Sequence, residues 1–78
     1  MVNGFELNSS EDLVINALEL TSINALVAYK AYEKKTSEEV VRHVFSDHFG
    51  INSLDKLPKD SFDRAIRFLV DVQLHTVN

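Results

Sequence analysis

The sequence contains no cysteine, and this absence excludes several kinds of stabilisation and of chemistry. Disulfides cannot form, and neither a thiolate zinc site nor a thiol nucleophile can be built. The chain has only two glycines and one proline, and it carries no glycine-rich phosphate-binding loop. A chain without cysteine fits a reducing compartment.

Targeting and membrane-spanning segments are also missing from the sequence. The first residues lack the basic group and the apolar run of a secretory signal. No stretch reaches the roughly 20 apolar residues that would span a bilayer. We therefore expect a cytoplasmic protein.

The length of 78 residues fits one domain, and we treat residues 1–78 as a single helical domain. A chain this short buries only about 60% of the surface that its unfolded form exposes. Apolar residues make up 45% of the chain, which is typical of globular proteins, and the formal charge is −4. A general nucleic-acid binder would be basic. Without disulfides, stability must come from good helix packing or from self-association.

Apolar spacing and cap residues predict an all-α fold, a compact bundle of three to four helices. No window alternates with the two-residue period of a strand. Thr36 and Glu39 have the spacing of a capping box, and Gly50 is a typical residue after a helix end. The expected elements are a lead-in over 1–8 and helices over about 10–35, starting near Ser9 or Ser10, over 37–49 and over 59–75.

The first predicted helix is apolar on nearly all sides. One stripe consists of Val14, Leu18, Thr21, Ala25, Ala28 and Tyr32. A neighbouring stripe consists of Leu13, Ala17, Leu20, Asn24, Val27 and Ala31, and the remaining side carries Ile15, Ile23 and Leu26. Such a helix is buried on more than one side, which one small chain can hardly provide. Two explanations remain open: the helix breaks near 21–22, or a second protein molecule covers one side.

The tyrosines of this helix define a candidate interface. Tyr29 and Tyr32 share a side of the helix with Ala25 and Ala28. Small residues let another helix come close, and tyrosine suits a partly hydrated interface. Packing against the last helix of the same chain is the competing interpretation. The candidate interface residues are Val14, Leu18, Ala25, Ala28, Tyr29 and Tyr32.

Candidate metal-binding and catalytic residues all have a simpler structural role. His43 and Asp47 share one side of the second helix, but a metal site needs further ligands. We interpret them as a surface pair, and His48 as a residue that caps or packs at the helix C-terminus. The acidic pairs at 11–12 and 38–39 suit helix N-termini. We therefore expect no enzymatic activity, no cofactor and no metal.

Clustered basic residues define an alternative, nucleic-acid-binding function. The candidate contacts are Lys30, Lys34, Lys35, Arg42, Arg64 and Arg67. The first four of these residues form one cluster, and Arg64 and Arg67 belong to a second. Both clusters are interleaved with acidic residues, and Asp60–Arg64 and Asp63–Arg67 have the spacing of helical ion pairs. The long connection over 50–58 disfavours a helix-turn-helix reader, whose turn is short.

A further alternative is an acidic inhibitor of a basic host protein, such as a nucleic-acid-binding or defence protein. In that case the acidic side chains of the second helix and the following connection would contact the partner. They are Glu38, Glu39, Asp47 and Asp55.

The stretch over 43–69 contains Phe49-Gly50-Ile51, then Asn52-Ser53, an aliphatic pair around Asp55-Lys56, Leu57-Pro58, and a helix with Phe62, Ala65 and Ile66. This pattern resembles the C-terminal helical module of phage antirepressor-type regulatory proteins. A preceding helix with tyrosines, as at Tyr29 and Tyr32, is also similar. This sequence lacks the tryptophan often found near the end of such modules. The resemblance implies a phage- or prophage-type accessory module that acts through protein contacts, and it transfers no catalytic residue.

Together these observations predict a homodimeric protein–protein interaction module that modulates a regulator or host factor. The motivating feature is the excess apolar surface of the first helix. The predicted core consists of Leu13, Ala17, Leu20, Val41, Val44, Phe45, Leu57, Phe62, Ile66 and Leu69.

Overall fold

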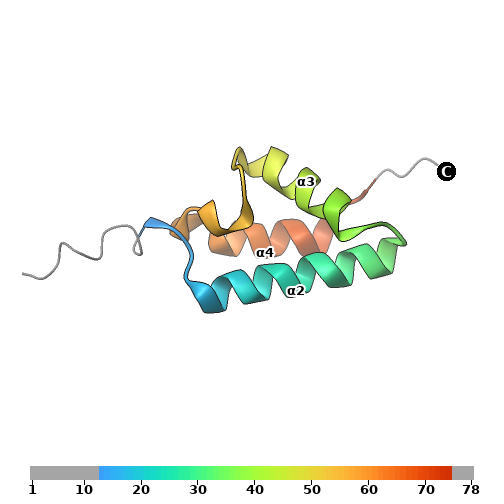
Figure 1. Cartoon of the computed structure of the whole chain (residues 1–78), viewed down its shortest axis with the longest axis horizontal. Coiled ribbons are helices and arrows are strands. Elements are labelled where there is room, and N and C mark those ends of the chain that lie inside the picture. The colour runs from blue at the N-terminus through green and yellow to red at the C-terminus, as the bar shows by residue number, and fades with distance from the viewer. Residues whose placement is uncertain (1–12, 75–78) are drawn as a thin grey trace, which may run out of the picture.

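The longest helix, α2, begins at an asparagine that caps it. In the computed structural model, which describes residues 13–74, α2 spans Ala17–Lys34 (Figure 1). The Asn16 side chain accepts a hydrogen bond from the backbone N–H of Glu19 at 2.8 Å, and the Asn16 N–H donates to the Glu19 carboxylate at 2.9 Å. This reciprocal capping box satisfies two backbone groups that would otherwise lack partners at the helix start.

Val14, Ile15 and Asn16 lie outside any helix, which corrects the continuous helix expected over 10–35. Val14 forms an isolated antiparallel bridge with Pro58, and the Ile15 N–H donates to the Leu57 carbonyl at 3.0 Å. Because these backbone groups pair with a distant segment, they do not continue the helix. The expected lead-in and the expected start at residue 9 or 10 lie outside the described residues.

The possible helix break near 21–22 is absent, because α2 is continuous through both residues. The Thr21 hydroxyl donates to the Ala17 carbonyl at 3.0 Å. This bond to the preceding turn satisfies the hydroxyl inside the helix without ending it. Of the two explanations for the apolar helix, an internal break at this point is therefore wrong.

The second expected helix is α3, which spans Glu38–Phe49. Its cap is Ser37, whose hydroxyl accepts from the Val40 N–H at 3.2 Å, so the predicted capping box at Thr36 and Glu39 is wrong. The N–H of Thr36 instead donates to the Ala31 carbonyl at the end of α2. At its other end α3 stops at Gly50, which has the positive φ of 67° that glycine adopts without steric cost.

Two short 3₁₀ turns lead into the last helix. They span Leu54–Lys56 and Lys59–Ser61, and α4 then spans Phe62–Asp71. The helix expected over 59–75 thus begins as a 3₁₀ turn and ends earlier, because Val72 is extended. Leu57 is extended too, as expected for a residue before proline.

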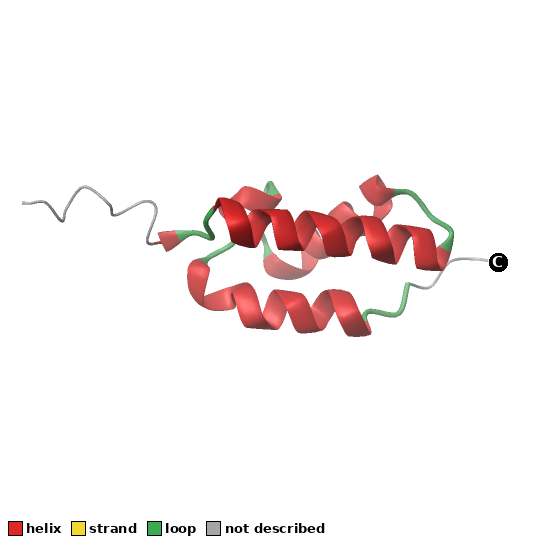
Figure 2. Cartoon of the chain, turned by 90° about the horizontal axis from the view of Figure 1, so that it is seen from below, coloured by secondary structure: helices red, strands yellow, loops and turns green. Residues whose placement is uncertain are grey.

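Over residues 13–74 the three α-helices pack as a compact all-α globule. α2 and α4 lie side by side and run in the same direction, while α3 packs above them in the view of Figure 1. Figure 2 shows the same pair of helices from below. Within residues 13–74 no strand is present beyond the isolated bridge, and no helix there is both long and apolar enough to cross a membrane.

The core lies between α2 and the other two helices. Its buried apolar residues are Ile15, Ile23, Val27, Ala31, Val41, Phe45, Leu54, Leu57, Ala65 and Leu69. Four predicted core residues are among them: Val41, Phe45, Leu57 and Leu69. Four others are half-buried: Leu20, Val44, Phe62 and Ile66.

Leu13 and Ala17 were predicted for the core but are exposed, Leu13 to 69%. The prediction failed at Leu13 because Val14, Ile15 and Asn16 lie outside any helix and interrupt the helical register. Ala17 lies inside α2, but the buried stripe of this helix follows Ile23, Val27 and Ala31 and leaves Ala17 to one side. The residues that α2 contributes to the core thus lie along one stripe of the helix, and its other sides do not belong to the core.

Candidate protein interface

The side of α2 that points away from α3 and α4 carries large apolar residues in contact with solvent. Leu18, Tyr29 and Tyr32 are 78%, 60% and 83% exposed. Soluble proteins rarely leave such residues clustered on one surface unless the surface has a partner. We call this surface the outward face, and it consists of Leu18, Thr21, Ser22, Ala25, Ala28, Tyr29 and Tyr32.

None of the seven residues of the outward face is charged. The charged residues of α2 lie on other sides of the helix, and two of its pairs are tied within the chain. Lys59 Nζ lies 3.0 Å from Glu19 Oε1, and Lys30 Nζ lies 3.1 Å from Glu33 Oε1. The solvent face of a surface helix normally carries charged and polar residues. The outward face of α2 lacks a charged residue, although Thr21 and Ser22 are polar and the exposed Glu33 borders it one turn after Tyr29.

The residues predicted for the interface fall mostly on this face. Leu18, Ala25, Tyr29 and Tyr32 are exposed there, and Ala28 is half-buried at its edge. Val14 is separate from them, because it lies before the helix in the bridge to Pro58. The competing interpretation, in which the tyrosines pack against the last helix, is excluded for this chain by their exposure.

The N-terminal end of α2 is fixed by hydrogen bonds to a single carboxylate. Glu19 Oε1 accepts from the Asn16 N–H at 2.9 Å and from Lys59 Nζ at 3.0 Å. The Asn16 N–H, and to a lesser extent the Lys59 ammonium, hold the pKa of Glu19 below its ordinary value of 4.5. The contact with Lys59 connects α2 to the turn that precedes α4, so it helps to fix the N-terminal end of α2 against the rest of the domain.

The basic residues proposed for nucleic-acid contact do not form one surface. Lys30 is buried, and its ammonium donates to Glu33 and to the Val70 carbonyl. Arg42 lies 3.4 Å from Glu38 within α3. The exposed Lys35 ends α2, beside the half-buried Lys34, while Arg64 and the exposed Arg67 belong to α4. The Asp60–Arg64 and Asp63–Arg67 ion pairs predicted from spacing are not formed among residues 13–74.

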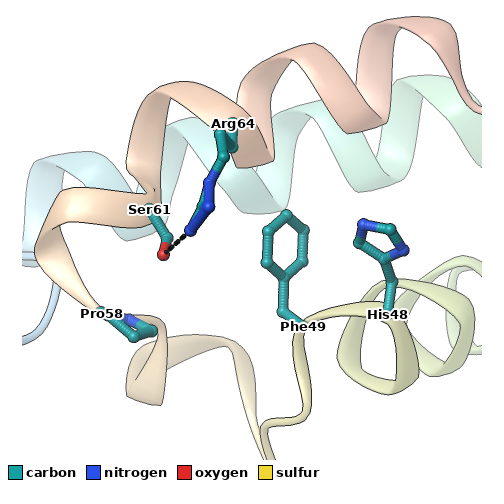
Figure 3. Close-up of a pocket in the computed structure, with 5 residues that line it drawn as sticks. All are labelled: His48, Phe49, Pro58, Ser61 and Arg64. Atoms are coloured by element: carbon teal, nitrogen blue, oxygen red, sulfur yellow. Dashed lines mark hydrogen bonds between the residues drawn. The ribbon is translucent and has the colours of Figure 1, made fainter.

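A hollow of about 310 Å³ between the end of α3 and the start of α4 was not predicted from the sequence. It is lined by His48, Phe49, Pro58, Ser61 and Arg64 (Figure 3). Arg64 donates to the hydroxyl oxygen of the buried Ser61 at 2.7 Å, and the ring of Phe49 stands between this pair and His48. A guanidinium cannot accept a proton, so this arrangement does not activate Ser61 as a nucleophile.

The two histidines of α3 differ in their surroundings, because His48 contacts aromatic rings and His43 is exposed to solvent. The His48 ring stacks on Phe68 with centroids 4.3 Å apart and planes at 22°, and it meets Phe49 edge-on, which agrees with a packing role. His43 and Asp47 are exposed. Among residues 13–74, no three potential ligands of the histidine, cysteine or acidic type are grouped to hold a metal.

The acidic residues of the inhibitor alternative are all exposed but spread over two elements. Glu38 and Glu39 lie at the start of α3, Asp47 lies near its end, and Asp55 lies in the first 3₁₀ turn. The Ser53 hydroxyl donates to Asp55 at 2.6 Å and is the main reason why the pKa of Asp55 is below its ordinary value. Of the candidate sites, the outward face of α2 alone combines several predicted residues on one continuous surface.

Comparison of the chain with family models, with curated proteins and with solved structures finds no match in any of the three.

Proposed function

We propose that this chain is a protein–protein interaction module that forms a homodimer through the outward face of α2. In that form it modulates a regulator or host factor, and it does so by contact and not by catalysis. The observation that carries the proposal is the exposure of Leu18, Tyr29 and Tyr32 on one uncharged side of a helix. The resemblance of residues 43–69 to phage regulatory modules supports an accessory role of phage or prophage type.

The energetic basis of the proposal is the removal of apolar surface from water. Burial of apolar surface contributes about 25 cal/mol per Å², so a leucine and two tyrosines form a substantial anchor. Tyrosine is enriched at interfaces, because its ring is apolar and its hydroxyl tolerates water. Alanine, threonine and serine between the anchors let a second helix approach closely. No charged residue belongs to the outward face itself, so covering its seven residues desolvates a charge only at the border, where Glu33 is exposed.

Light scattering at high micromolar concentration tests the proposal. We expect the mass of two chains, with dissociation on dilution. A substitution Tyr32→Glu places a charge in the proposed contact and should weaken dimerisation by at least about tenfold. The matched control is Val40→Glu, which changes an exposed apolar residue of α3 and should leave the dimer intact. A monomer at high micromolar concentration for the unsubstituted protein would contradict the proposal.

A further inference from the structure

We infer that the hollow between the end of α3 and the start of α4 binds an aryl carboxylate, a small organic acid with one flat apolar ring. The hollow is lined by His48, Phe49, Pro58, Ser61 and Arg64, and none of these five residues is acidic. None of them belongs to α2 either, so this site is separate from the outward face and goes beyond the proposed homodimer.

The hydroxyl of Ser61 offers a hydrogen-bond donor to a molecule in the hollow. Ser61 is 5% exposed, and its oxygen accepts from Arg64 Nη2 at 2.7 Å. No acceptor among residues 13–74 takes its hydroxyl hydrogen, and the hydroxyl does not cap α4. Buried hydroxyl donors are normally satisfied, because a donor without an acceptor has given up its hydrogen bond to water without replacement. An acceptor oxygen of a ligand would complete the hydrogen bonding of Ser61.

The guanidinium of Arg64 supplies the positive charge of the hollow. Its bond to the Ser61 oxygen fixes the orientation of the group, and it forms no ion pair with an acid of residues 13–74. Asp60 and Asp63 are its exposed neighbours in the chain, and neither lines the hollow. A guanidinium presents parallel N–H groups that match the two oxygens of a carboxylate. Arg64 therefore fits a carboxylate, and the positive N-terminal end of α4 favours the same charge.

The aromatic side chains of the hollow favour a flat apolar body next to the carboxylate. The Phe49 ring stands between Arg64 and His48 (Figure 3). His48 is itself held by Phe68, whose ring stacks on it with centroids 4.3 Å apart. Aromatic rings attract one another in offset stacks or edge to face. The hollow of about 310 Å³ lies at the lower end of the range for small-molecule pockets, about 300–1,000 Å³, so a single ring fits better than a nucleotide.

Titration of the isotope-labelled protein with benzoate, followed by the NMR shifts of its backbone amides, tests the site. We expect the amides around Phe49 and Ser61 to shift together, with a Kd of about 1 mM or below. Acetate and inorganic phosphate carry charge but no ring, and benzyl alcohol carries the ring but no charge. Each of these three probes should bind at least about tenfold more weakly than benzoate.

Two substitutions separate the contacts of the carboxylate from general attraction by positive charge. Arg64→Gln should weaken benzoate binding at least about tenfold, because the charged pair of donors is lost. The matched control is Arg67→Gln, which changes an exposed arginine of α4 outside the hollow and should alter the Kd less than about twofold. Ser61→Ala removes one donor and should weaken binding about threefold to tenfold. Circular dichroism of each variant checks that the fold is kept.

Three results would overturn the inference. The first is that benzoate moves no amide near the hollow at about ten times the expected Kd. The second is an equal loss of affinity in Arg64→Gln and Arg67→Gln, which would indicate general attraction by charge. The third is that acetate, phosphate or benzyl alcohol binds as tightly as benzoate. None of these results bears on the homodimer, since Arg64→Gln should leave the mass in light scattering unchanged and Tyr32→Glu should leave the affinity for benzoate unchanged.

Discussion

The ammonium group of Lys30 donates a hydrogen bond to the backbone carbonyl of Val70 at 3.1 Å and so joins the middle of α2 to the last turn of α4. Lys30 is 5% exposed, and its ammonium also meets Glu33 at 3.1 Å. The last carbonyls of a helix lack partners within the helix, and a cation is favoured beside them. The buried lysine therefore fixes the position of α4 against α2, on the side opposite the outward face.

Replacing Lys30 by methionine should lower the free energy of unfolding by about 1–2 kcal/mol, because the carbonyl of Val70 loses a charged donor while the apolar stem is kept. Chemical denaturation followed by circular dichroism measures the change. The control is Glu33→Gln, which removes the partly exposed partner and should cost at most about 0.5 kcal/mol. Equal effects of the two substitutions would mean that the carbonyl contact is unimportant.

Two helix ends in the left-handed conformation should respond to substitution with opposite signs. Gly50 has φ 67°, and nothing lies within 4 Å of an added Cβ, so the cost of Gly50→Ala comes from the backbone alone. We expect a loss of about 1–2 kcal/mol in the free energy of unfolding. Lys35 has φ 58° and carries a side chain, so Lys35→Gly should raise stability by about 0.5–1 kcal/mol. Denaturation midpoints test both, and destabilisation by Lys35→Gly would contradict the argument.

The hydrogen bonds to Glu19 predict how stability depends on pH. Its pKa is lower in the folded chain than in the unfolded chain, so its stabilising effect is present above the unfolded pKa and is lost as the pH falls through the folded pKa. The Glu19→Gln variant should therefore lose less free energy of unfolding between pH 6 and pH 3 than the unsubstituted protein does. This pH interval includes the ordinary glutamate pKa of 4.5.

Lys59→Met serves as the graded control for Glu19, because it removes one donor but leaves the larger contribution of the Asn16 N–H. Denaturation curves across that pH range should place its acid sensitivity between those of the unsubstituted protein and Glu19→Gln. The interpretation fails if Lys59→Met and Glu19→Gln behave alike.

The contact between His48 and Phe68 predicts a difference between two histidines of one helix. His48→Ala removes a ring that stacks on Phe68 and should cost about 0.5–1.5 kcal/mol of the free energy of unfolding. His43→Ala, at an exposed position of α3, should change stability by no more than about 0.5 kcal/mol. Thermal unfolding of the two variants compares them under one condition, and the reverse order would rule out a packing role for His48.

Local signals in the sequence predicted much of this fold. Gly50 ends α3, and the residue before Pro58 is extended, because glycine and proline restrict the backbone by themselves. The start of α2 could not be predicted in this way. Asn16 caps it only because the preceding residues pair with Leu57 and Pro58, a contact between segments far apart in the chain. At the start of α3 the sequence offers two neighbouring hydroxyl residues, Thr36 and Ser37, as possible N-caps. Ser37 is the cap, and the Thr36 N–H donates to the Ala31 carbonyl at the end of α2.

The candidate site was predictable in its composition but not in its orientation. Helical spacing placed Leu18, Ala25 and Tyr32 on one side of α2. The sequence could not decide which side α3 and α4 cover, because Ile23 and Val27 on the opposite side are equally apolar. Lys30 belongs to the buried stripe, although lysine normally marks a solvated face, and only its long-range contact with Val70 explains this.

The pairing of Ile15 with Leu57 has a consequence for how the domain opens. The hydrogen bonds inside α2 join residues close in sequence, and those near its ends exchange with solvent whenever the helix frays. The Ile15 N–H is held by a carbonyl of a distant segment at 3.0 Å, so it exchanges when these two segments separate. Closing so long a loop carries an entropic cost that the locally connected α2–α3 pair avoids, and we expect this contact to form late in folding. Amide exchange at this one position therefore reports when the N-terminal segment detaches from the rest of the domain.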